Sequence, residues 1–148
     1  MDGRRWRVFL DTSALLAGII STKGAAREVL RLCEAGIVDV FLSRQVLVEA
    51  DRNLSEKLPA LVEDFRDFMR KMAPVLLDDP SPKEVFRASR VIHHKDAPIL
   101  AAAIRADVDY LVTWNTRHFH KQSVMKAVRF KIVTPGDFLV EFRGALPR

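Results

Sequence analysis

Two polar residues follow apolar segments that are expected to be buried strands. Asp11 comes directly after Val8-Phe9-Leu10, and Asn115 follows the segment 110–113. In parallel α/β sheets the ligand site lies beyond the carboxyl ends of the strands, which makes these positions the first candidates for chemistry. An aspartate in such a place can serve as a nucleophile or as a ligand of a cation. If the two strands are neighbours, Asn115 faces Asp11 across the crevice.

Asp11 has a second interpretation, because aspartate is also a good N-cap for the helix expected after it. Thr12 and Ser13 can provide that cap themselves, so a further capping residue would be redundant. This redundancy favours a functional role for Asp11. For Asn115, a turn and a functional role are equally open.

Two further acids have structural explanations in the expected helices. Glu49 lies at the edge of an apolar helical stripe, where a surface pair with Arg52 or Asn53 is the favoured interpretation from the residues alone. Asp96 stands at the start of a helix with Pro98 in its first turn, so it can be the N-cap. An aspartate in that place can also serve a metal if its helix points into the crevice.

The elements that must position these residues alternate between strands and helices. Apolar segments predict strands at 8–10, 38–42, 74–77, 110–113 and 130–133. Helical patterns predict helices at 14–20, 25–35, 44–54, 58–72, about 83–92, 96–106 and from 135 onward. Because the strands are apolar on both faces, we expect an α/β fold, a three-layer α/β/α sandwich with a mostly parallel sheet and Rossmann-like topology. Asp109 precedes its strand and is expected to be solvated at the opposite edge.

Composition limits the class of protein. The chain has 148 residues, of which 49% are hydrophobic and 29% charged, which is typical of one globular domain. No apolar run is long enough for a membrane span or a signal peptide, and we expect a cytoplasmic protein. The single Cys33 excludes an intramolecular disulfide and a cysteine-based zinc cluster. A formal charge of +5 favours an anionic partner only weakly, because solubility alone explains it.

Four segments, taken together and in this order, resemble the PIN-domain family. They are Val8-Phe9-Leu10-Asp11-Thr12-Ser13, the helix with Glu49, Lys95-Asp96-Ala97-Pro98-Ile99-Leu100-Ala101-Ala102-Ala103, and Leu111-Val112-Thr113-Trp114-Asn115-Thr116-Arg117-His118-Phe119. The resemblance covers about residues 7–142 of a single domain at 1–148. It implies a VapC-like, metal-dependent ribonuclease, a type in which many members are toxins of bacterial and archaeal toxin–antitoxin pairs.

The resemblance also implies roles for individual residues. Asp11, Glu49 and Asp96 match the family's metal-binding acids, Asn115 matches its fourth acidic position, and Ser13 matches a polar position near the first acid. The family often has Asn where Ser13 stands and Asp where Asn115 stands. Because Asn115 is neutral, it lowers the negative charge of the site. This argues against a tightly held second metal ion and not against activity.

The chemistry of these residue types agrees with the resemblance. Mg²⁺ and Mn²⁺ prefer oxygen ligands, and close carboxylates repel one another until a cation compensates their charge. Such an ion would polarise a phosphodiester and lower the pKa of an attacking water. By family likeness the substrate is RNA, a small antitoxin is a possible partner, and a homodimer is expected.

Basic residues close in sequence to these segments are candidates for contacts with RNA phosphates. We single out Arg44, Lys95, Arg117 and His118, although for most of these basic residues, taken one at a time, a solvated basic rim is the favoured explanation. The histidines at 93, 94, 118 and 120 lack the spacing of a zinc site. Trp114 could stack on a base, whereas Phe119 is expected in the core.

Two alternatives stay open. A haloacid-dehalogenase-like phosphatase would also place an aspartate after the first strand, but it normally needs an acid two residues on, where Ser13 stands. A PIN-like module that binds RNA or protein without cutting is favoured by one feature, the neutral Asn115.

Overall fold

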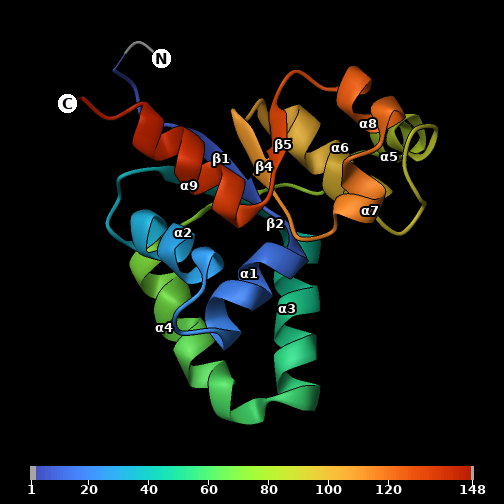
Figure 1. Cartoon of the computed structure of the whole chain (residues 1–148). Coiled ribbons are helices and arrows are strands. Elements are labelled where there is room, and N and C mark those ends of the chain that lie inside the picture. Colours follow the sequence, from blue (N-terminus) through green and yellow to red (C-terminus); the bar gives the residue numbers. More distant parts are fainter. Residues whose placement is uncertain (1–2, 148) are drawn as a thin grey trace.

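A sheet of five parallel strands forms the centre of the protein (Figure 1), of which the computed structural model describes residues 3–147. The strands are β1 (Arg7–Leu10), β2 (Asp39–Ser43), β3 (Val75–Leu77), β4 (Tyr110–Val112) and β5 (Lys131–Val133). Their order is β3-β2-β1-β4-β5, so β1 lies between β2 and β4. The chain leaves β1 toward one edge of the sheet and later returns to the other side of it. The pair β1–β4 is therefore the point where a ligand site is expected in such a fold.

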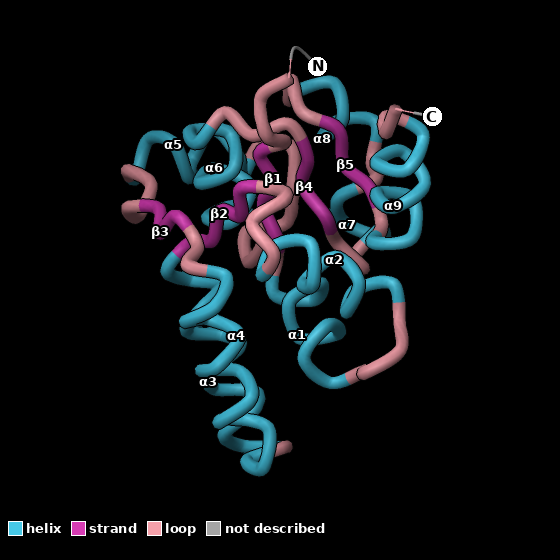
Figure 2. Tube along the Cα trace, turned by 90° about the vertical axis from the view of Figure 1, so that its left-hand side faces the viewer, coloured by secondary structure: helices cyan, strands magenta, loops and turns pink. Residues whose placement is uncertain are grey.

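Helices cover both faces of the sheet and make the fold a three-layer α/β/α sandwich. On one face lie α1 (Thr12–Ile20), α2 (Ala25–Glu34) and α9 (Pro135–Gly144), and on the other lie α5 (Pro82–Ser89) and α6 (Ala97–Ala106), as Figure 2 shows. The short helices α7 (Thr116–Phe119) and α8 (Gln122–Ala127) connect β4 to β5. This architecture confirms the predicted fold class.

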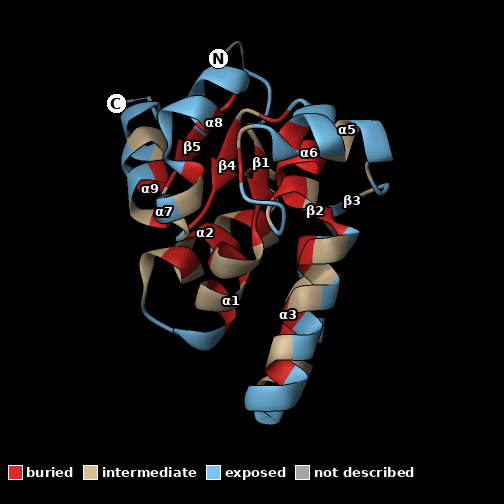
Figure 3. Ribbon diagram, turned by 90° about the vertical axis from the view of Figure 1, so that its right-hand side faces the viewer, coloured by how far each residue is buried: buried red, intermediate tan, exposed pale blue. Residues whose placement is uncertain are grey.

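A helical hairpin extends beyond the sheet. It consists of α3 (Arg44–Lys57), a 3-10 turn (η1, Pro59–Leu61) and α4 (Val62–Met72). The far end of α3 is exposed, whereas the strands of the sheet are largely buried (Figure 3). The N-terminus of α3 follows directly after the carboxyl end of β2, and this places Glu49 near the carboxyl edge of the sheet.

Local sequence explains where the elements begin and end. Ser43 caps α3 by accepting a hydrogen bond from the Val46 amide at 3.2 Å, as predicted. Ser81 and Glu84 form a capping box at the start of α5. Gly36 follows α2 with φ of 72°, a conformation that glycine adopts without strain and that ends the helix as expected.

The predicted elements are all present, and the largest shifts of their boundaries are in α3, α4 and α5. The helix expected at 44–54 continues to Lys57, and the helix expected from residue 58 begins with the η1 turn because Pro59 starts a new segment there. The helix expected to reach about residue 92 ends at Ser89, whose hydroxyl donates to the Phe86 carbonyl at 2.6 Å and competes with the helical pattern. Within residues 3–147, no helix has the length and apolar character that crossing a bilayer requires.

Candidate active site

Asp11 lies directly after β1, beside the carboxyl end of β4. Leu10 is paired with Val112 across these strands, so the residues that follow them, Asp11 and Thr113, lie side by side. The Asp11 side chain is only 3% exposed, and three donors hold it. Its Oδ1 accepts from the Ser13 hydroxyl at 2.7 Å and from the Ala14 amide at 2.9 Å, and its Oδ2 accepts from the Thr113 hydroxyl.

The structure corrects the argument about the helix cap. Asp11 is itself the N-cap of α1, and Thr12 and Ser13 lie in the first turn, where neither acts as the cap. The Thr12 hydroxyl donates instead to Glu49 Oε2 at 2.8 Å, and the Ser13 hydroxyl accepts from the Trp114 amide at 2.9 Å. The expectation of a redundant cap was therefore wrong, because both hydroxyls are used to join separate parts of the site.

Burial raises the pKa of the Asp11 carboxyl above its usual value. The hydrogen bonds from Thr113, Ala14 and Ser13 oppose this shift, and the nearby charge of Asp96 adds to it. Asp11 is thus a buried carboxyl group with an acidic neighbour, and its ionised form is undercompensated by the protein. A cation bound beside Asp11 and Asp96 would supply the missing charge.

Glu49 points from α3 toward α1. Its Oε2 accepts from Thr12, and its Oε1 accepts from Gln45 Nε2 at 2.9 Å. Asn53 donates at 2.8 Å to the backbone carbonyl of Glu49 and leaves the carboxylate free for the other partners. The favoured surface pair with Arg52 or Asn53 was therefore wrong for the Glu49 carboxylate.

Asp96 occupies the N-cap position of α6, but its side chain makes no capping hydrogen bond. Its Oδ2 lies 2.6 Å from His118 Nδ1 instead. The carboxylate is 16% exposed and the imidazole 34% exposed, so both side chains are partly buried. The structural explanation of Asp96 as a side-chain N-cap is wrong, and His118 lies within the site, next to an acid.

Asn115 reaches the same cluster from the end of β4. Its backbone amide donates to the Thr113 hydroxyl at 2.8 Å, and its Nδ2 lies 3.4 Å from His118 Nδ1. Thr113 is fully buried and was missed by the sequence analysis. A polar residue at the end of an otherwise apolar strand beside Asp11 was the available signal. Gln45 was missed too, although its spacing of four residues from Glu49 is typical of a helical side-chain pair.

The structure thus brings the predicted residues to one edge of the sheet through short connections. Thr12, the residue after Asp11, donates to Glu49, and Thr113 donates to Asp11 while accepting from the Asn115 amide. His118 contacts Asp96. Over the described part of the chain, no three His, Cys, Asp or Glu side chains are grouped closely enough to hold one metal ion. Each candidate acid is hydrogen-bonded to a neighbouring side chain instead.

The predicted RNA-contact residues lie around this cluster. Arg44 pairs with Asp79 at 3.2 Å and borders the same surface hollow as Glu49. Lys95 and Arg117 are exposed. Trp114 is 49% exposed, whereas Phe119 is buried in the core as predicted.

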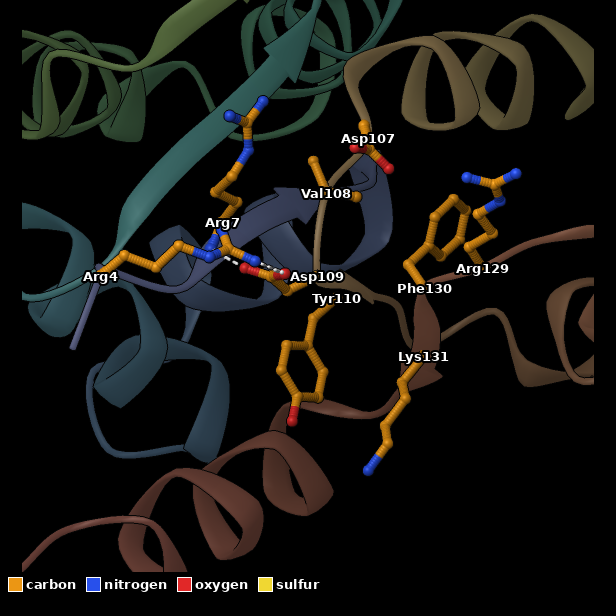
Figure 4. Close-up of a pocket in the computed structure, with 9 residues that line it drawn as sticks. All are labelled: Arg4, Arg7, Asp107, Val108, Asp109, Tyr110, Arg129, Phe130 and Lys131. Atoms are coloured by element: carbon orange, nitrogen blue, oxygen red, sulfur yellow. Dashed lines mark hydrogen bonds and ion pairs between the residues drawn. The ribbon is translucent and has the colours of Figure 1, made fainter. Parts of the chain in front are cut away.

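A larger hollow of about 500 Å³ lies at the opposite edge of the sheet (Figure 4). Asp109 stands in it, accepting from the Arg7 amide at 2.7 Å and pairing with Arg4 at 2.8 Å. The Asp109 side chain is only 15% exposed, so the expectation of a solvated residue was wrong, although its place at the opposite edge is confirmed. The Arg7 guanidinium donates to the Ala106 carbonyl and lies over the Phe41 ring, which is a structural use of its charge.

Known proteins resemble this chain in sequence and in fold. A family model described as "PIN domain" matches residues 7–117. A segment of 49 residues is 39% identical to the Mycobacterium tuberculosis protein named "Putative ribonuclease VapC50"; it makes up 33% of this chain and 28% of that protein.

Two solved structures share the fold. The crystal structure of PAE2754 from Pyrobaculum aerophilum aligns with a TM-score of 0.62 and 19% identity, over 94% of this chain and 96% of that one. VapBC2 from Rickettsia felis, crystallised with a DNA fragment from its promoter, aligns with a TM-score of 0.58 and 19% identity, over 86% of this chain and 96% of the other. Since the family model spans most of the polypeptide, including the segments of all four predicted site residues, this chain belongs to the PIN domain family.

Proposed function

We propose that this protein is a metal-dependent endoribonuclease of the toxin type, which hydrolyses RNA phosphodiester bonds with Mg²⁺ or Mn²⁺. The observation that carries the proposal is the buried Asp11 carboxyl at the switch point of the sheet, with a raised pKa and with Asp96 as an acidic neighbour. The similarity to VapC50, which is named as a ribonuclease, supports the choice of nucleic acid as substrate.

The donor set fits a hard divalent cation. Asp11, Glu49 and Asp96 offer carboxylate oxygens and Asn115 offers an amide oxygen, which are the ligand types that Mg²⁺ and Mn²⁺ prefer. Joint binding requires the carboxylates to turn away from some of their present hydrogen-bond donors. The Thr12 and Gln45 contacts of Glu49 can be exchanged in this way, whereas Asp96 can keep His118 on Oδ2 and offer Oδ1 to the ion.

When bound, the cation would supply Lewis-acid polarisation of the phosphodiester and a lowered pKa for the attacking water. The protein's own residues would do the positioning. Ser13 and Thr113 hold the Asp11 carboxylate at a fixed place on the rigid end of β1. Arg44, Lys95 and Arg117 lie at the rim, where they would bind the phosphates of the strand that leads to the acids.

The toxin role rests on the family and on the fold shared with VapBC2. On this reading a small antitoxin would bind the protein and block its crevice, and the active form would be a homodimer. Copurification with a small protein encoded beside it, and light scattering of the isolated chain, would test the two parts separately.

A second candidate function is a PIN-like module that binds RNA or protein without cutting. The neutral Asn115 in place of a fourth acid favours it, as do the hydrogen bonds that already satisfy each acid. A phosphatase that uses Asp11 as nucleophile is disfavoured, because donors hold both Asp11 oxygens and Ser13 binds the Trp114 amide where a second acid would be needed.

Incubation with single-stranded RNA distinguishes these functions. We expect the wild type to cleave the RNA with Mn²⁺ and to lose cleavage with EDTA, and we expect Asp11→Asn to be inactive in both conditions. Asp51→Asn is the matched control, since Asp51 is an exposed acid of α3 outside the cluster. Binding of RNA without cleavage in any metal would support the module, and release of phosphate from a small monoester would support the phosphatase.

A further inference from the structure

Three histidine rings follow one another beside the acidic cluster. The ring centroids of His93 and His94 are 4.2 Å apart, and those of His93 and His118 are 5.7 Å apart with the planes inclined by 16°. His118 in turn contacts Asp96. The histidine row, defined as His94, His93 and His118, therefore leads from the surface to a candidate metal ligand.

The backbone fixes the row relative to Asp96. The His93 carbonyl accepts from the amides of Asp96 at 2.9 Å and Ala97 at 3.1 Å, which closes a tight turn before α6. Within the turn, the Lys95 amide donates to His93 Nδ1 at 3.2 Å and orients that ring. Gln45 of α3 donates to the Lys95 carbonyl at 3.4 Å and ties the turn to the helix that carries Glu49. The His93 ring is thus held in place by the turn without any ligand.

The outer part of the row is open to solvent. His93 and His94 are exposed, and so are Lys95 beside them and Arg117 beside His118. Exposed flat rings next to cationic side chains match the two parts of a single-stranded nucleotide, a base with a π-face and a phosphate. A paired base inside a duplex does not offer its face to such rings.

We propose that the outer face of the His94 ring, backed by the ring of His93, forms a stacking site for an unpaired RNA base near the phosphate that the acidic cluster acts on. The position of that phosphate rests on the proposed nuclease function, whereas the stacking itself does not. The site selects single-stranded RNA over duplex RNA, and Lys95 and Arg117 bind the flanking phosphates of either form.

The test is RNA binding in EDTA, where no cleavage interferes. The probe is a short single-stranded polyadenosine RNA that contains a fluorescent purine analogue, whose emission is quenched on stacking. We expect His94→Ala to abolish the quenching and to weaken binding about fivefold. A fivefold loss is the lower end of the range for losing one base–aromatic contact. We expect His94→Phe to bind and quench like the wild type, because it keeps a ring and loses the imidazole nitrogens.

Two controls separate stacking from charge and from folding. Lys95→Ala should weaken binding to single-stranded and duplex RNA alike, whereas His94→Ala should leave duplex binding unchanged. His93→Phe keeps the middle ring and should retain quenching; thermal unfolding of each variant checks that the fold is intact.

Each outcome decides one of the two proposals. Equal binding by the wild type, His94→Ala and His94→Phe would overturn the stacking site, and so would an equal loss in both variants. If the stacking site is overturned in this way but the wild type cleaves RNA with Mn²⁺, the nuclease proposal is still supported. Normal stacking by a wild type that cleaves no RNA would overturn the nuclease and leave the stacking site standing.

Discussion

His118 Nδ1 lies 2.6 Å from Asp96 Oδ2, and this contact joins helix α7 to the start of α6 across a sequence separation of 22 residues. Asp96 makes no capping hydrogen bond, so His118 is the partner that orients its carboxylate. A hydrogen-bond partner that does not itself touch the metal can orient a carboxylate ligand and so change the affinity of the metal site.

Replacement of His118 should therefore weaken metal binding. We expect His118→Ala to lower Mn²⁺ affinity about 10-fold or more, as loss of an outer-shell partner does in metal sites. His118→Asn places an amide nitrogen near the position of Nδ1 and should restore most of the affinity. Titration calorimetry with Mn²⁺ measures both variants, and equal affinities in wild type, Ala and Asn variants would contradict the assigned role.

Asp11 should make the metal-free protein less stable as the pH rises. Its folded pKa is raised above the usual 3.8, so the folded state keeps the proton after the unfolded chain has released it. The free energy of unfolding consequently falls as the pH rises from about 3.8 through the folded pKa. Asp11→Asn has no carboxyl group at this position, so its stability should not show this pH-dependent loss.

Urea unfolding in EDTA over a series of pH values measures that difference. Above the folded pKa, Asp11→Asn should be more stable than the wild type, and the gap should close as the pH falls toward 3.8. Added Mn²⁺ should stabilise only the wild type. A gap that does not change with pH would show that Asp11 carries no buried charge.

The Thr113 hydroxyl should be needed for the stability of the folded protein. Thr113→Val removes the donor to Asp11 Oδ2 and the acceptor of the Asn115 amide, at a cost of about 1–3 kcal/mol for buried groups left unpaired. Thr113→Ser keeps the hydroxyl and should lose less than half of that. Chemical unfolding measures both variants, and a loss in Thr113→Ser as large as that in Thr113→Val would contradict a dominant role for the hydroxyl.

Gly18 should be required by the packing of α1 on α2. A Cβ at this position would lie 2.5 Å from Leu30 Cδ1 and 3.0 Å from the Ala26 carbonyl oxygen. Gly18→Ala should destabilise the protein by about 1–3 kcal/mol, although alanine favours a helix. Gly136→Ala in α9 is the matched control, because a Cβ there meets nothing within 4 Å, and it should be neutral or stabilising. Thermal unfolding of the two variants should therefore shift in opposite directions or by clearly different amounts.

Cys33 should be chemically inert in the folded protein. Burial raises the pKa of its thiol to about 12, so almost no thiolate is present at neutral pH. We expect iodoacetamide to label the unfolded chain completely and the native protein not at all over the same time. Mass spectrometry reads this directly because the chain has one cysteine, and equal labelling rates would contradict the packing of α2.

Much of the fold could be predicted from the sequence because its signals are local. Short apolar strands between helices indicate a parallel sheet, and Ser43 and Gly36 mark helix ends by their own side-chain and backbone preferences. The expected position of Asp11, after the first strand and beside the end of β4, is also confirmed. The hydrogen bonds of Asp11 could not be predicted, because Thr113 lies 102 residues away and becomes a neighbour only through the β1–β4 pairing.

The same reason limited the prediction of Glu49 and Asp96. From the residues alone, Glu49 was better explained by a surface pair and Asp96 by a helix cap, and only the family resemblance favoured a site. In the structure, the partners that turn them inward are Thr12, 37 residues from Glu49, and His118. Contacts across that distance follow from the topology of the sheet and leave no local pattern in the sequence.

The most direct test of the account is a crystal structure with Mn²⁺, located by its anomalous scattering. We predict one anomalous peak at the carboxyl edge of β1, with oxygens of Asp11, Glu49 and Asp96 at about 2.1 Å, the distance typical of small divalent cations. In that state the Thr12 contact to Glu49 would be lengthened or replaced, while Asp96 would keep His118 on Oδ2 and bind the ion through Oδ1. A peak at another place, or a peak without Glu49 or Asp96 among its ligands, would contradict the proposed metal site.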